Sequence, residues 1–143
     1  MERSTTTPDE FLASLPDGAR QDLEALDAAI APVFAGHERV LWAGVFWGGT
    51  RQQIVGYGAY TYRGRSGTTG EWFVVGIAAQ KGAYSLYVNA AEDGQNLMKR
   101  EGAKLGKAKL GSAVASFRRF ADIDLQAVVA MATRARDLML GAP

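Results

Sequence analysis

The sequence contains no cysteine, one histidine (His37) and no apolar run that approaches the ~20 residues of a membrane-spanning helix. Without cysteine, disulfides, thiolate metal sites, iron–sulfur clusters and cysteine nucleophiles are excluded. A single imidazole removes most of the material for zinc sites and for Ser-His-Asp triads. The chain also opens with polar and acidic residues rather than with a signal peptide. We therefore expect a soluble, cytoplasmic protein that has no membrane partner.

Charge is balanced over the whole chain but is unevenly placed along it. The 143 residues carry a net charge of +1 and 48% of them are hydrophobic, which predicts one globular domain with a sizeable core. Seven acidic residues lie between Met1 and Ala31, whereas seven of the 16 Lys and Arg residues lie between Lys99 and Arg119. Such an asymmetry is typical of solvated helix faces of opposite sign, and it can also mark binding faces.

Two helices are predicted near the beginning of the chain, after a polar leader at 1–6 that we expect to be disordered. Thr7 can cap the first helix while Glu10 closes a capping box. The start signal is repeated at Ser14–Asp17, and apolar residues then recur at helical spacing. We expect the second helix to end within Pro32–Gly36.

Four segments in the middle of the chain are rich in Val, Ile, Tyr, Trp and Phe. They are Arg39–Trp47, Gln53–Tyr62, Glu71–Ala79 and Ala83–Asn89. Glycine-bearing turns, among them Gly48-Gly49, separate them, which predicts an antiparallel meander. Gly56 and Gly58, inside the second strand, indicate either a bulge or a helix pressed against the sheet.

The remaining part of the chain is predicted to be a helix at Gly94–Leu105, a fifth strand at Val114–Phe120 and a last helix. Asp122 is expected to cap that helix, which ends at Gly141. The element order is therefore ααββββαβα, in a single domain over 7–141. This order predicts an α+β sandwich in which helices pack on one face of a mostly antiparallel, five-stranded sheet.

Several segments of the chain resemble, in the same order, the sequences of one family. They are Asp9–Pro16 (DEFLASLP), Glu71–Gly76 (EWFVVG), Tyr84–Tyr87 (YSLY), Leu105–Gly111 (LGKAKLG) and Arg118–Leu125 (RRFADIDL). On these residues the chain resembles the YdhG-like family of uncharacterised bacterial domains. The resemblance implies a frataxin-like fold and, through the similarity to frataxins, an iron-handling role.

The tract from Lys99 to Arg119 is where charge, glycine and pattern converge on a candidate site. The residues predicted to bind an anionic ligand are Lys104, Lys107, Lys109, Ser112, Arg118 and Arg119. Arg100, Lys104 and Lys107 share a helix face if the helix continues that far. The glycine loop that follows can turn amide groups toward a phosphate or carboxylate. Arg118 and Arg119 are neighbours on a strand, so we expect only one of them to join the site.

Acidic residues of the second predicted helix offer an alternative site, for iron. The candidate metal ligands are Asp17, Asp22, Glu24 and Asp27. Carboxylate oxygens suit hard cations and need no cysteine. However, Arg20 interrupts the row, and acids in the first turn of a helix also stabilise its dipole. A structural role is therefore the competing interpretation of these residues.

The sequence predicts a binding or accessory module without a catalytic function or a cofactor, because no constellation of residues supports an enzyme. Its expected partner is a small anionic ligand or another protein, and its expected state is a monomer or homodimer. The alternative is an iron-binding chaperone of the frataxin kind. Strand aromatics beside a basic tract can stack bases, but a net charge near zero argues against a nucleic-acid partner.

Overall fold

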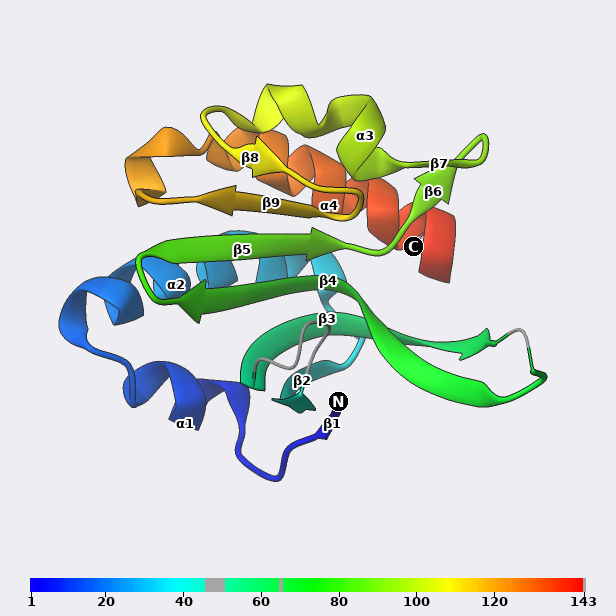
Figure 1. Cartoon of the computed structure of the whole chain (residues 1–143), viewed down its shortest axis with the longest axis horizontal. Helices are drawn as coiled ribbons and strands as arrows, with labels where there is room; N and C mark the ends of the chain where they lie inside the picture. Colours follow the sequence, from blue (N-terminus) through cyan, green and yellow to red (C-terminus); the bar gives the residue numbers. More distant parts are fainter. Residues whose placement is uncertain (46–50, 65, 143) are drawn as a thin grey trace.

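A seven-stranded antiparallel sheet runs through the computed structural model, which describes residues 1–45, 51–64 and 66–142 (Figure 1). Its strands lie in the order β1-β2-β3-β4-β5-β9-β8. Their bounds are β1 Glu2–Arg3, β2 Arg39–Val45, β3 Arg51–Arg63, β4 Thr69–Gln80, β5 Ala83–Val88, β8 Lys109–Leu110 and β9 Val114–Phe117. A separate hairpin is formed by β6 (Ala91–Glu92) and β7 (Gln95–Asn96).

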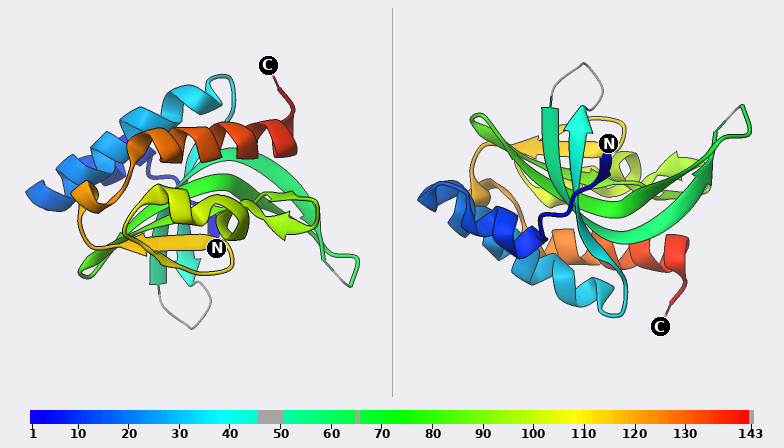
Figure 2. Two further views of the ribbon diagram at one scale, coloured as in Figure 1. Left: turned by 90° about the horizontal axis from the view of Figure 1, so that it is seen from above. Right: turned by 90° about the horizontal axis from the view of Figure 1, so that it is seen from below.

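In the described residues, four α-helices pack on the sheet. Their bounds are α1 Pro8–Ala13, α2 Asp17–Ile30, α3 Leu97–Glu101 and α4 Leu125–Leu140. Figure 2 shows α2 and α4 running side by side across one face of the sheet. Phe11, Leu26, Met98 and Met131, one from each helix in chain order, belong to a single large hydrophobic core. The prediction of an α+β domain with helices against an antiparallel sheet is confirmed.

The other face of the sheet carries a smaller cluster of its own. Leu41 belongs to the large core whereas its neighbour Trp42 belongs to the small cluster, and the same alternation separates Val55 from Ile54. The buried members of the small cluster are Trp42, Ile54, Phe73, Ala78 and Tyr87. Aromatic side chains therefore cover part of the face that is opposite the helices.

The described sheet has seven strands rather than the five expected. One additional strand, β1, lies in the leader at 1–6, so the prediction that this leader is disordered is wrong. β1 pairs with β2, and the Arg3 guanidinium pairs with the carboxylates of Glu38 and Glu71. The other additional strand, β8, pairs with β9. Both strands are two residues long and are too short to carry an alternating pattern.

The last helix begins later than predicted. The Asp124 carboxylate accepts hydrogen bonds from two backbone N–H groups of the first turn, so Asp124 is the cap and the prediction of Asp122 is wrong. Asp122 instead ends a 3₁₀ turn at Phe120–Asp122. This turn also explains why the strand expected over 114–120 stops at Phe117.

The helix predicted over 94–105 is shorter in the structure. It runs as α3 and then tightens into a 3₁₀ turn at Gly102–Leu105. The strand predicted over 39–47 is described as far as Val45. The Gly48-Gly49 turn lies outside the described residues.

Gly58 is the point at which the end of α4 presses on β3. Its φ is +72°, and a Cβ at this position would lie 2.9 Å from Leu140 Cδ1 and 3.2 Å from the Phe34 ring. The pairing register of β3 with β4 is the same on both sides of Gly58, so no residue is inserted. The pressed helix is therefore confirmed at Gly58, whereas a Cβ at Gly56 would meet the Trp42 and Phe73 side chains at 2.7 Å. The bulge is wrong at both glycines, because the register is unbroken.

Replacing Gly58 by alanine is expected to lower the free energy of unfolding by about 2–4 kcal/mol, because positive φ and overpacking against Leu140 both oppose a side chain. Gly82→Ala is the matched control, since Gly82 also has a positive φ (+78°) but a Cβ at this position would meet no atom within 4 Å. Gly82→Ala should lower the free energy of unfolding by about 1 kcal/mol, because only the positive φ opposes the side chain there. Urea denaturation measures both losses, and equal values would contradict the packing argument.

Candidate anion-binding site

The basic tract does not form the single helix face that its spacing predicted. The α-helix ends at Glu101, and the chain leaves the following 3₁₀ turn at Gly106, whose φ is +113°. Lys104 and Lys107 therefore do not share a helix face. The Lys104 ammonium lies 2.5 Å from the Glu101 carboxylate. Arg100 pairs with a carboxylate of the neighbouring β6–β7 turn.

Gly106 marks a crossing of two backbone segments. The Lys107 N–H donates to the Asp122 carbonyl (N···O 2.8 Å), and the Asp124 N–H donates to the Leu105 carbonyl (2.7 Å). A Cβ at Gly106 would lie 2.3 Å from the Asp122 carbonyl oxygen, so any other residue would force the segments apart. The crossing holds the chain that leads into β8 beside the chain that follows β9.

A surface hollow of about 670 Å³ lies beside this crossing. Lys107 and Lys109 approach it from one segment, and Arg118 and Arg119 approach it from the end of β9. The residues that line it are Ala83, Lys107, Ala108, Lys109, Ser116, Phe117, Arg118, Arg119 and Asp122. The structure thus brings together cations that are separated in sequence by the whole of β9.

Four of the six residues predicted for an anionic ligand line the hollow. Arg118 and Arg119 both do so, and the expectation that only one could join is wrong, because the alternation of β9 ends at Phe117. Lys104 and Ser112 are exposed and are not among the lining residues. Sequence reasoning also missed Asp122 as a site residue because it was assigned to the helix cap.

The four cations of the hollow are exposed and uncompensated. In the part of the chain that the structure describes, the ion pairs include six arginines but none of the lysines or arginines that line the hollow. Asp122 is the one acid among the lining residues, so these side chains carry a formal net charge of +3. This concentration of unpaired charge is what an anion would recognise.

The acidic residues of α2 have partners on the same helix and on the sheet. Asp17 and Glu24 both pair with Arg20, at 3.2 Å and 3.9 Å. The Asp22 carboxylate accepts a hydrogen bond from the Tyr84 hydroxyl (O···O 2.6 Å). These three carboxylates therefore have partners on the helix and on β5.

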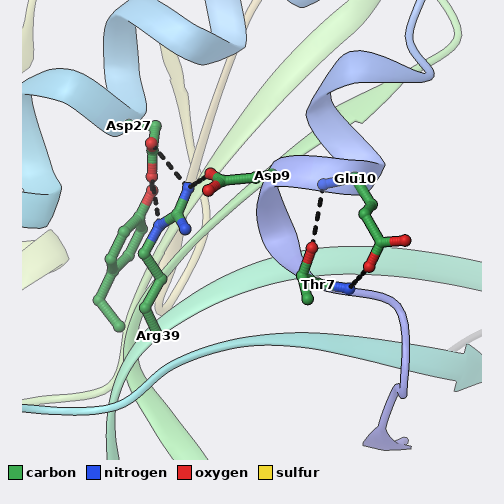
Figure 3. A network of polar contacts seen from close by, with 6 residues as sticks. Thr7, Asp9, Glu10, Asp27 and Arg39 are labelled. Atoms are coloured by element: carbon green, nitrogen blue, oxygen red, sulfur yellow. Dashed lines mark hydrogen bonds and ion pairs between the residues drawn. The ribbon is translucent and has the colours of Figure 1, made fainter.

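Asp27 forms the centre of a polar network that joins both N-terminal helices to the sheet (Figure 3). Arg39 donates from two nitrogens to its carboxylate, at 2.9 Å and 2.8 Å, and also to Asp9 at 2.9 Å. The Tyr57 hydroxyl donates to the same carboxylate at 2.6 Å. Burial and the negative charge of Asp27 raise the pKa of Tyr57 well above its usual value.

The predicted metal ligands are thus spread along α2, and each of them already has a partner within the protein. Among residues 1–45, 51–64 and 66–142, no three histidine, aspartate or glutamate side chains are grouped so that they could hold a metal ion. The structure does not bring Asp17, Asp22, Glu24 and Asp27 to one point.

The aromatic residues of the strands separate into two groups. The buried group in the described strands is Trp42, Tyr57, Phe73, Tyr84, Tyr87 and Phe117. The other group, which lines a second hollow of about 450 Å³, is Tyr60, Tyr62 and Trp72. Met1, Val45 and Asn89 also line that hollow, which shares no lining residue with the basic hollow. Figure 1 shows β3 and β4 extending beyond the rest of the sheet. Among the described residues, the cations of the basic hollow and these three aromatic rings are therefore not combined into one surface for bases.

Comparison of the chain with protein-family models, with curated proteins and with solved structures finds no match in any of the three. In the described residues, no helix is long and apolar enough to cross a membrane.

Truncating Asp27 to alanine is expected to lower the free energy of unfolding by about 3 kcal/mol, because the buried Tyr57 hydroxyl would lose its acceptor and Arg39 would keep only Asp9. Asp17→Ala is the matched control, since the Asp17 side chain is 89% exposed, and it should cost less than about 0.5 kcal/mol. Urea denaturation measures both variants. Equally small losses would show that the network does not stabilise the fold.

The contact between Tyr84 and Asp22 predicts a loss of stability at alkaline pH. Burial, followed by the Asp22 carboxylate, raises the pKa of Tyr84 from 10.0 to about 12. A tyrosine with a raised pKa stabilises the folded state fully below its unfolded pKa, and that contribution is lost as the pH rises through the folded value. The free energy of unfolding should therefore fall less steeply in Tyr84→Phe than in the unaltered protein between about pH 9 and about pH 12. A slope that Tyr84→Phe leaves unchanged would contradict the link between the Tyr84 hydroxyl and this loss of stability.

Proposed function

We propose that the protein is a non-catalytic binding module that holds a small anionic ligand, or an anionic group of a protein partner, in the basic hollow. The observation that carries this proposal is the convergence of Lys107, Lys109, Arg118 and Arg119 without acidic partners among the described residues. Uncompensated cations at one place attract an anion and are stabilised by it.

The types of side chain in the hollow suit an oxyanion. A guanidinium offers a planar pair of donors that matches a carboxylate or phosphate, and an ammonium adds a compact point charge. The backbone crossing at Gly106 holds the two cationic segments beside each other before any ligand arrives. Binding therefore costs less ordering of the chain than it would on a flexible loop.

We also propose that the chain is a YdhG-like domain with a frataxin-like fold. The order of the similar sequence segments supports this, and so does an antiparallel sheet with helices packed on it. The iron-chaperone alternative would require Asp22 and Asp27 to give up Tyr84, Tyr57 and Arg39 as partners. No contact among the described residues favours that exchange, whereas the cations of the hollow have no partner to give up.

Inorganic phosphate is expected to raise the melting temperature of the protein. At ten times the dissociation constant, binding contributes about 1.4 kcal/mol, which corresponds to a shift of roughly 4 °C for a domain of this size. In Lys107→Ala/Lys109→Ala the shift should disappear. Thermal denaturation with phosphate, against sodium chloride of equal ionic strength, measures it.

The matched control for this experiment is Lys99→Ala/Lys104→Ala. It removes the same charge from the same tract, but neither lysine lines the hollow. Its phosphate shift should equal that of the unaltered protein. A shift that both double variants retain would reflect the general effect of phosphate on protein surfaces, and the proposal would then be wrong.

A further inference from the structure

The basic hollow is larger than a single oxyanion requires. Its volume of about 670 Å³ falls in the range of small-molecule sites, roughly 300–1,000 Å³. Beside the four cations it is also lined by Asp122, the neutral side chains of Ala83 and Ala108, and the hydroxyl-bearing Ser116. A ligand that fills it therefore has an anionic end and a further, uncharged part.

The Asp122 carboxylate is not used by the fold. The backbone of Asp122 is fixed, since its N–H donates to the Arg119 carbonyl at 3.0 Å and its C=O accepts from Lys107 at 2.8 Å. Within the described ranges its carboxylate takes part in no hydrogen bond or ion pair, although four cations line the same hollow. Asp122 is half-buried and is among the residues that line the hollow.

We propose that the ligand of this hollow is a phosphorylated sugar, whose phosphate lies on the lysines and arginines and whose hydroxyl donates to the Asp122 carboxylate. This inference rests on the proposed function, because it names the ligand class of the same site. A free sugar phosphate and the ribose phosphate of a nucleotide share this chemistry, and titration with one ligand of each kind separates them.

The charges of the hollow select a hydroxyl as the group that meets Asp122. A carboxylate accepts hydrogen bonds from either a hydroxyl or an ammonium group. Four cations against one carboxylate would repel an ammonium group of the ligand, whereas a neutral hydroxyl group feels no such repulsion. A second anionic group at this point would be repelled by Asp122 itself.

Calorimetric titration of the full chain with inorganic phosphate, glucose 6-phosphate and AMP, at equal ionic strength, tests this inference. We expect glucose 6-phosphate or AMP to bind about tenfold more tightly than inorganic phosphate, the gain of one hydrogen bond to a charged group. Whichever of these two ligands binds more tightly shows whether the site takes a free sugar phosphate or the ribose phosphate of a nucleotide. In Asp122→Ala the advantage should vanish, while inorganic phosphate binds at least as tightly because one negative charge is removed.

Glu2→Gln is the control for the loss of a negative charge, since Glu2 is exposed on β1 and does not line the hollow. It should leave all three affinities unchanged. Asp122→Asn keeps the size of the side chain and one acceptor, so it should retain part of the advantage, and it replaces Asp122→Ala if that variant does not fold.

The outcomes separate the two proposals. If all three anions bind equally, or if the advantage survives in Asp122→Ala, the inference about the sugar is wrong and the anion site stands. If none of the three anions binds, the anion site is wrong and this inference is overturned with it.

Discussion

The crossing of Leu105–Lys107 with Asp122–Asp124 is the contact on which the basic end of the molecule depends. Two backbone hydrogen bonds, which pair Gly106 with Ile123 as an antiparallel bridge, join the segments at a separation that leaves no room for a side chain at position 106. On one side the crossing directs the chain into β8, and on the other it sets the turn from which α4 starts. One close approach of backbones therefore determines the last edge of the sheet, the start of a core helix and the hollow between them.

The two faces of the sheet are completed in different ways, and the difference explains why the first residues of the chain are ordered. Helices α2 and α4 bury one face, whereas the other is covered partly by aromatic contacts such as Trp42 with Trp72, whose ring centroids are 5.5 Å apart. The Arg3 guanidinium lies 5.3 Å from the centroid of the Trp42 ring while it pairs with Glu38 and Glu71. β1 therefore extends the sheet, and Arg3 covers part of the small cluster through a cation–π contact. No local sequence pattern at 1–6 predicts this contact.

Helices and strands with a regular hydrophobic pattern could be predicted from the sequence, because the spacing of their own apolar side chains determines which structure buries them. In α2, Leu23, Leu26 and Ile30 recur at helical spacing and are fully buried. Contacts between distant segments could not be predicted in this way. The approach of Lys107 to Arg119 follows from the crossing at Gly106, and the partners of Asp22 and Asp27 lie on strands far along the chain. The i,i+3 rule for Lys104 and Lys107 failed because it presumes a helix that the positive φ of Gly106 ends.

The contacts of the charged side chains explain the uneven distribution of charge along the sequence. The acids of α2 are already engaged, Asp27 by Arg39 and Asp22 by Tyr84. Tyr84 also contacts Phe117, with ring centroids 5.7 Å apart, and Phe117 lines the basic hollow. The acidic helix and the hollow are therefore neighbours, yet within the described chain no ion pair joins them. Arg20 and Arg39 offset part of the charge of the α2 acids, and in the described chain none of these acids pairs with a cation of the hollow. The lysines and arginines of the hollow therefore form a localised positive site in a chain whose net charge is only +1.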